Sequence, residues 1–88
     1  MSQPSRTFGT RLREVRTRRK ISQRELVEWL RGLGFDLHQP AISGIESGKR
    51  QLSFDEAVAI ARFLKIPLEA LYMSWEDWLV FESEFGLG

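Results

Sequence analysis

The chain has 88 residues and a mass of 10.2 kDa, with 42% hydrophobic residues, 28% charged residues and no cysteine. This length allows one small domain with a single core, and the lack of cysteine excludes a disulfide scaffold, a thiolate zinc site and a cysteine nucleophile. The longest apolar stretch, Ala57 to Ala61, is too short to span a bilayer, and no signal-peptide hydrophobic region opens the chain. We therefore expect a cytoplasmic protein with no membrane partner.

The net charge of +1 conceals an uneven distribution. Residues 1–50 contain eleven Lys or Arg and five Asp or Glu, whereas residues 51–88 contain two and seven. Seven of the ten aromatic residues lie from Phe54 onward. A basic first part followed by an acidic, aromatic second part suggests a polyanion-binding face at one end, although ordinary solvated charge gives the same composition.

The first helix is predicted after a short segment without a pattern. Residues 1–6 are expected to form a flexible N-terminal arm. Phe8, Leu12 and Val15 then recur at the i, i+4 and i+7 spacing of one buried helix face. Arginine and lysine occupy many of the other positions up to Lys20, so we expect this helix to add to the basic surface.

Two more helices are predicted between residues 22 and 48. Ser22 and Glu25 match a capping box, in which each side chain satisfies a free backbone N–H of the other residue. The buried face of the second helix is expected to consist of Leu26, Val27 and Leu30, and Gly32 and Gly34 are expected to end it. A short third helix is expected to bury Ile42 and Ile45 and to stop at Gly48.

Helices are also predicted in the second half of the chain. Ser53 and Glu56 form another capping box before the longest periodic segment, Phe54 to Leu64, and a brief helix is predicted over Leu68 to Tyr72. Ser74 starts a final amphipathic run. No segment alternates with the period of two that marks a strand, so the predicted fold class is all-α.

Three stretches of sequence, in this order and spacing, carry a resemblance to a known family. They are ISQREL, HQPAISGIESGKR and LSFDEAVAIARFLKIPLEALY. From Phe8 to Tyr72 the chain resembles the lambda-repressor-like (XRE-type) helix-turn-helix domains of phage and bacterial regulators. The resemblance implies a compact five-helix domain over residues 7–72, with residues 73–88 as an extra C-terminal amphipathic helix. It also implies that a recognition helix, Gln39 to Ser47, enters the major groove of double-stranded DNA.

The resemblance places base-reading residues on this recognition helix. A glutamine at position 39 can pair bidentately with adenine, and Pro40 and Ala41 can lie against a thymine methyl group. Gly44 stands where relatives often carry a long polar side chain, so it allows either a close backbone approach to DNA or no contact. The base-reading candidates are Gln39, Pro40, Ala41, Ser43 and Gly44.

A second group of residues is expected to contact phosphates. Gln23 lies in the first turn of its helix, where its amide and the free backbone N–H groups can reach a phosphate, with simple solvation of the helix start as the alternative. His38, the single histidine, has no second metal ligand nearby and is expected to cap the recognition helix or to touch a phosphate. The phosphate-binding candidates are Arg6, Gln23, Arg24, His38, Lys49 and Arg50.

Two further features concern how the helices are held. The resemblance implies a structural ion pair between Arg16 and Glu46, which would pin the first helix to the recognition helix. The connection from Leu30 to Gln39 is longer than is usual in the family. It is either a harmless enlargement, whose Leu33, Phe35 and Leu37 cover the core, or an adjustment of how the recognition helix enters the groove.

The C-terminal run carries more large apolar residues than a small monomer usually exposes. Trp75, Trp78, Leu79 and Glu82 are expected on one face, with Phe81 and Phe85 beside it. These residues could complete the core, form a homodimer interface or dock on a protein partner. The dimerisation candidates are Trp75, Trp78, Leu79, Phe81 and Phe85.

Together these features predict a sequence-specific DNA-binding transcriptional regulator of the phage-repressor type that acts as a homodimer. The alternative is an antitoxin or adaptor whose C-terminal helix binds a protein, with DNA binding secondary. The chain has no P-loop, no glycine-rich nucleotide fingerprint and no cluster of metal ligands. We therefore expect neither an enzyme nor a bound cofactor or metal.

Overall fold

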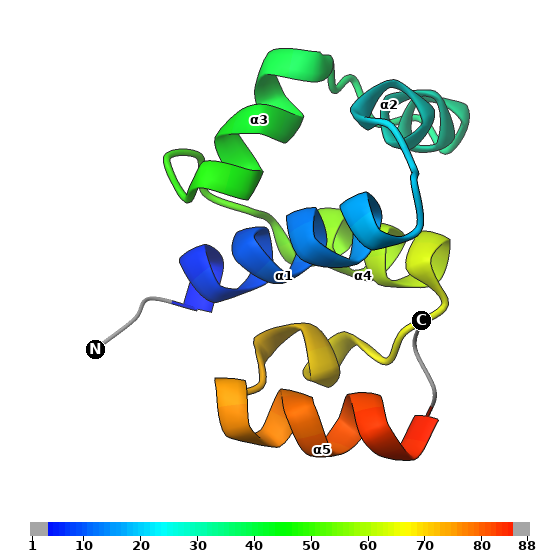
Figure 1. Cartoon of the computed structure of the whole chain (residues 1–88). Helices are drawn as coiled ribbons and strands as arrows, with labels where there is room; N and C mark the ends of the chain where they lie inside the picture. Colours follow the sequence, from blue (N-terminus) through cyan, green and yellow to red (C-terminus); the bar gives the residue numbers. More distant parts are fainter. Residues whose placement is uncertain (1–3, 86–88) are drawn as a thin grey trace.

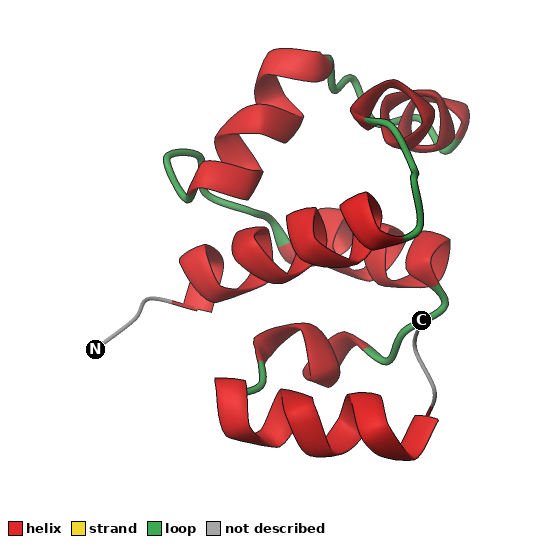
Figure 2. Cartoon of the chain, in the orientation of Figure 1, coloured by secondary structure: helices red, strands yellow, loops and turns green. Residues whose placement is uncertain are grey.

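A computed structural model describes residues 4–85, and every regular element in that range is a helix (Figures 1 and 2). The elements are α1 (Pro4–Arg18), α2 (Gln23–Gly32), α3 (Gln39–Ser47), α4 (Phe54–Leu64), the 3-10 helix η1 (Leu68–Tyr72) and α5 (Trp75–Phe85). The predicted all-α fold class is confirmed. None of these helices combines the length and the apolar character that a bilayer crossing requires.

The first helix begins earlier than predicted. Because α1 starts at Pro4, residues 4–6 are helical and do not belong to an arm. Proline suits the start of a helix, since its fixed φ matches the first turn and its missing N–H would have no partner there. The rest of the predicted arm, residues 1–3, lies outside the described residues.

Three serines set the starts of α2, α4 and α5. The Ser22 hydroxyl accepts a hydrogen bond from the backbone N–H of Glu25 at 3.0 Å, and Ser74 accepts one from Asp77 at 3.2 Å. At Ser53 both halves of the capping box form, because its own backbone N–H also donates to the Glu56 carboxylate. These caps satisfy N–H groups that the first helical turn leaves without partners.

Helix α1 lies at the centre of the molecule. It packs against α3 on one side and against η1 on the other, while α2 and α4 complete the layer around the core (Figure 1). Its predicted apolar face, Phe8, Leu12 and Val15, is buried. The crossing with α3 is so close that a Cβ atom on Gly9 would lie 1.9 Å from the carbonyl oxygen of Ile45. Gly9 is therefore the residue that lets the two helices meet.

The apolar face predicted for α5 is divided between the core and the solvent. Trp78 and Phe81 are buried, whereas Trp75 and Leu79 are exposed. The cap at Ser74 starts the helix at Trp75, and the Arg11 guanidinium lies 4.4 Å from the centre of the Trp78 ring. That contact fixes which side of α5 faces α1. The side chain of Phe85 lies outside what the structure describes.

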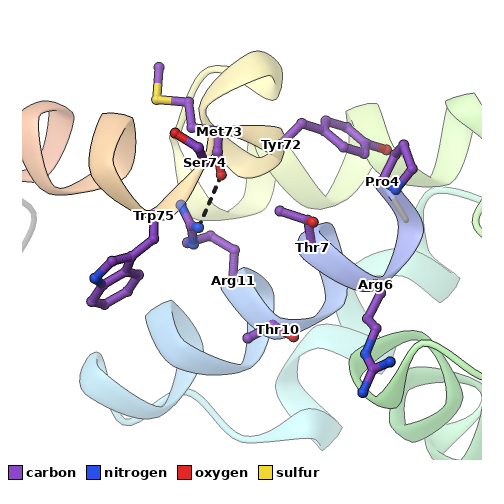
Figure 3. A pocket seen from close by; sticks show the side chains of 9 residues that line it. All are labelled: Pro4, Arg6, Thr7, Thr10, Arg11, Tyr72, Met73, Ser74 and Trp75. Carbon is purple, nitrogen blue, oxygen red and sulfur yellow. Dashed lines mark hydrogen bonds between the residues drawn. The ribbon is translucent and has the colours of Figure 1, made fainter. Parts of the chain in front are cut away.

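Much of the positive charge of α1 is used inside the molecule rather than on its surface. Arg11 donates to the main-chain oxygen of Met73 at 3.2 Å, as Figure 3 shows, and Arg19 donates to that of Leu64. Arg18 pairs with Glu82 on α5. These arginines join α1 to its neighbours, whereas Arg6 and Arg13 of the same helix are exposed, so only part of the charge of α1 adds to the basic surface.

Candidate nucleic-acid interface

Helix α3 presents one polar side to solvent. Ile42, Ile45 and Glu46 are buried, whereas Gln39, Pro40 and Ser43 are exposed. The helix begins after His38 with Pro40 in its first turn and ends at Gly48, whose φ of +79° is the left-handed conformation that favours glycine. In Figure 1, α3 lies on the opposite side of α1 from α5. The exposed side of α3 is thus clear of the acidic end of the molecule.

Arg16 and Glu46 form the ion pair that the resemblance implied. Arg16 donates from Nε to one Glu46 oxygen at 2.7 Å and from its second terminal nitrogen to the other at 3.1 Å. Their side chains are only 13% and 5% exposed, so the pair is shielded from water. Arg16 also donates to the main-chain oxygen of Ile21, which ties the α1–α2 turn to the same cation.

Gln23 joins this ion pair to the exposed side of α3. Its amide nitrogen donates to Glu46 at 3.0 Å. Its amide oxygen accepts hydrogen bonds from the Gln39 amide at 3.2 Å and from the Ser43 hydroxyl at 3.3 Å. A continuous set of contacts therefore runs from Arg16 through Glu46 and Gln23 to the two polar candidates for base contact.

This network leaves hydrogen-bonding groups available at the surface. A primary amide nitrogen carries two hydrogens. Gln39 uses one of them on Gln23, which leaves its second N–H and its oxygen on the exposed side of α3. Gln23 likewise uses one N–H on Glu46. The network thus orients both amides without using all of their hydrogen-bonding capacity.

Two of the five base-reading candidates do not lie fully on this exposed side. Ala41 is half-buried and packs against the core. Gly44 faces the α3–α4 loop, because a Cβ atom built there would lie 3.0 Å from the Cβ of Arg50. Gly44 therefore makes room for that loop, and its close approach to DNA bases remains a prediction.

Three phosphate-binding candidates are exposed at the edges of the α2–α3 unit. Arg6 lies against Gly48 at the end of α3, and Lys49 follows in the loop. Arg24 is in the first turn of α2 and is 3.4 Å from Glu28 in a well-solvated pair. The Arg24 side chain can leave Glu28 to meet a phosphate, since an exposed pair of this kind is held by about 1 kcal/mol or less.

His38 occupies the predicted N-cap position of α3 but does not act as a side-chain cap. Its backbone is extended, as an N-cap requires, yet its ring makes no hydrogen bond to the helix N–H groups. The ring Nε2 instead lies 3.2 Å from the Asp36 carboxylate in the α2–α3 connection. The capping prediction was wrong because the ring turns toward this carboxylate.

Arg50 does not project from the loop as predicted. Its two terminal nitrogens donate to the two oxygens of Glu56 at 3.0 and 3.1 Å. These hydrogen bonds are the main reason why the pKa of Glu56 lies below its ordinary value of 4.5. Arg50 therefore fastens the α3–α4 loop to the start of α4. The sequence analysis assigned Glu56 only to the capping box of α4 and did not predict that it also binds Arg50.

The long α2–α3 connection packs only in part. Leu37 is buried and Phe35 is half-buried against the core, whereas Leu33 is exposed. The α2 end is closed by Gly34 at a φ of +95°, whose N–H donates to Arg31. The connection thus holds the start of α3 through Leu37 and leaves Asp36 beside His38.

A cavity lies elsewhere, between α1, η1 and α5. It has a volume of about 560 Å³, and its lining includes Thr10, Arg11, Tyr72 and Trp75 (Figure 3). Burial lowers the pKa of Arg11, and two nitrogens of its guanidinium have no partner among the described residues. Nothing in residues 4–85 groups three or more potential metal ligands.

Comparison with known proteins places the chain in a family. The profile of the helix-turn-helix domain family matches residues 7–71, and the chain belongs to this family, as its resemblance to lambda-repressor-like domains predicted. Among solved structures, the DNA-binding domain of BldD from S. venezulae is similar, with a TM-score of 0.64 and 22% sequence identity. The similarity covers 82% of this chain and all of that domain. No curated protein matches.

Proposed function

We propose that the protein is a sequence-specific DNA-binding transcriptional regulator of the phage-repressor type, with α3 as its recognition helix. The observation that carries this proposal is the network from the shielded Arg16–Glu46 pair through Gln23 to Gln39 and Ser43. It orients two polar side chains on the exposed side of a short helix that projects beyond α1. Such an arrangement lowers the entropy that base contacts would otherwise cost. The helix-turn-helix family and the likeness to a DNA-binding domain support it.

Base reading rests on Gln39 in this proposal. Its oxygen accepts from adenine N6, and its remaining amide N–H donates to N7, while its other N–H stays on Gln23. Ser43 donates to or accepts from a neighbouring base edge. Pro40 and, with less exposed surface, Ala41 provide apolar contact for a thymine methyl group.

Phosphate contacts fix the register of α3 on the duplex. The free backbone N–H groups at the start of α2 and the second amide N–H of Gln23 meet one phosphate. Arg6 and Lys49, at the other end of α3, meet a second stretch of backbone, and Arg24 and His38 extend the contact. Arg50 shapes the loop that carries Lys49 and contributes through this positioning.

The regulator is further proposed to act as a homodimer in the cytoplasm without catalysing a reaction. A dimer places two α3 helices in successive major-groove turns of a two-fold operator. An antitoxin or adaptor function is the second candidate, and one observation favours it. Trp75, Leu79 and Val80 of α5 are 55%, 46% and 58% exposed, which is unusual for large apolar residues in one helix.

The test is selection of bound duplexes from a random DNA pool, followed by the same selection with two variants. Gln39→Ala should relax the preference at one base position per half-site, because it removes a bidentate contact worth about 1–3 kcal/mol. Lys49→Ala should weaken binding to all duplexes alike, since a phosphate carries no sequence information. If the unmutated protein enriches no duplex, α3 does not read DNA.

A further inference from the structure

The outer face of α5 is apolar and acidic at once. Its exposed apolar residues Trp75, Leu79 and Val80 share the helix with carboxylates near both ends. The segment Trp75–Phe85 has four acidic residues and no basic one. Glu76 and Glu84 are exposed, while Glu82 pairs with Arg18 of the same chain. The face therefore fits a partner surface that is apolar and positively charged.

Pairing of α5 with α5 does not satisfy these requirements. Two copies of this face would bring carboxylates against carboxylates, since no lysine or arginine in α5 can lie between them. Like charges opposed across an interface are costly and are a common means by which proteins reject a wrong partner. The exposed apolar residues of α5 thus need a different surface.

A complementary surface lies on the same chain, where α4 leads into η1. A groove of about 450 Å³ is lined by the second half of α4 and the turn after it, including Val58, Arg62, Lys65, Pro67 and Leu68. Its lining is mainly apolar, with two cations and no carboxylate. Arg62 and Lys65 are the only basic residues of the chain after Arg50.

We propose that α5 of one copy of this chain docks in the α4–η1 groove of a second copy. Leu79 and Val80 enter the groove, and Glu76 and Glu84 meet Arg62 and Lys65 at its rim. The arrangement is reciprocal: a two-fold axis lets each copy supply one α5 and one groove. It specifies the interface of the homodimer and rests on the homodimer proposed above.

The reciprocal arrangement adds a second patch per copy to the interface. A stable interface buries about 800 Å² per partner, which is close to one-seventh of the 5755 Å² surface of this chain. Two patches per copy contribute more surface toward this size than α5 alone. Because α3 lies across α1 from η1 and α5, the dimer leaves both recognition helices uncovered (Figure 1).

A charge swap tests the interface in the full chain. One variant carries Glu76→Lys and Glu84→Lys, and the other carries Arg62→Glu and Lys65→Glu. The four residues are exposed, and circular dichroism with thermal melting checks that both variants fold. Sedimentation velocity should show the unmutated protein at twice the 10.2 kDa of one chain and each variant alone at 10.2 kDa. An equimolar mixture of the two variants should recover the dimer, because both contacts again pair opposite charges.

Three results would overturn the proposal. The first is an unmutated protein that stays monomeric at every concentration. The second is an α5 variant that pairs with the unmutated chain at least as well as with the groove variant, which would indicate contact between two α5 helices. The third is dimerisation that neither variant weakens by at least tenfold. Arg31→Glu, an exposed reversal in α2, is the control and should leave dimerisation unchanged.

DNA binding by the same variants separates the two proposals. A monomer that keeps its α3 surface should still bind a single half-site, with the same dependence on Gln39 as the unmutated protein. If half-site binding persists while the charge swap fails, only the interface is wrong. If the charge swap succeeds and no duplex is bound, the dimer stands and the DNA-binding function fails.

Discussion

The shielded pair between Arg16 and Glu46 is the residue-scale feature on which the α3 surface depends. Removing one partner leaves the other charge buried without compensation, which costs about 3 kcal/mol or more. We predict that Arg16→Met lowers the free energy of unfolding by about 3 kcal/mol in urea titrations. Arg16→Met combined with Glu46→Leu should cost less than the sum of the two single changes, because neither charge is then stranded.

The exposed pair of Arg24 and Glu28 provides a matched control. Its side chains are largely solvated, so Arg24→Met should change the free energy of unfolding by about 0.5 kcal/mol or less. Equal effects of Arg16→Met and Arg24→Met would mean that the Arg16–Glu46 pair does not hold α1 to α3.

Glu56 makes stability depend on pH in a defined direction. Hydrogen bonds from Arg50 hold the pKa of Glu56 below its ordinary value of 4.5 in the folded protein. The ionised carboxylate therefore stabilises the fold above that value, and the contribution is lost as the pH falls through the folded-state pKa. We predict that Glu56→Gln has a lower free energy of unfolding than the unmutated protein at pH 7. The difference between the two free energies should shrink toward pH 3.

Urea titration at several pH values measures this difference, with the exposed Glu28→Gln as the control. If the difference in free energy of unfolding between Glu56→Gln and the unmutated protein stays constant from pH 7 to pH 3, the ionised Glu56 carboxylate does not stabilise the fold through Arg50.

At this scale, sequence reasoning found contacts that follow from local spacing or from the family. The hydroxyl caps at Ser22, Ser53 and Ser74 depend on residues three apart, and they form, although only Ser53 shows both halves of a capping box. The pairing of Arg50 with Glu56 was missed. From the sequence alone, an arginine in a loop is expected to be exposed to solvent. The path of the loop, which brings Arg50 within hydrogen-bonding distance of the Glu56 carboxylate, is known only from the fold.

At the scale of the helices, the close crossing of α1 and α3 is the contact that holds the recognition helix. Alanine substitutions at two glycines, one inside this crossing and one outside it, should have opposite effects on stability. Gly9→Ala would place a methyl group on the carbonyl oxygen of Ile45, so we predict a loss of about 1–3 kcal/mol or more in the free energy of unfolding. Gly32 has no atom within 4 Å of a built Cβ and lies in the last turn of α2. Gly32→Ala should be neutral or stabilising by up to about 1 kcal/mol.

Thermal melting of the two glycine variants measures the contrast. A Gly9→Ala protein as stable as Gly32→Ala would mean that α1 and α3 do not approach each other closely. The same Gly9→Ala change should weaken DNA binding, since it displaces the helix that supports α3.

At the element scale, the positions of the helices followed from periodicity and caps, but the facing of α5 did not. Six large apolar residues in eleven allow more than one buried face, and the spacing alone cannot choose between them. The choice is made by Arg11, whose guanidinium lies on Trp78, and by Arg18, which pairs with Glu82. From the sequence, both arginines are expected to be ordinary surface charges.

At the scale of the whole molecule, the uneven charge of the sequence corresponds only in part to a separation of basic and acidic residues in the fold. Several arginines of α1 join elements together, while the exposed basic residues include the phosphate-binding candidates Arg6, Arg24 and Lys49 as well as Arg13, Lys20 and Arg31. Helix α5, which carries four acidic residues, lies across α1 from α3 (Figure 1). The proposed DNA-binding face and dimer interface therefore occupy opposite sides of one small core.

The most direct test of this account is an amide ¹H–¹⁵N NMR titration of the full chain with an enriched duplex. The largest shifts should occur at the start of α2, along the exposed side of α3 and at Lys49. Amides of α5 from Glu76 to Glu84 should remain unchanged by the duplex. Shifts concentrated in α5, or no change in α3 at saturating duplex, would contradict the claim that α3 is the DNA-reading helix.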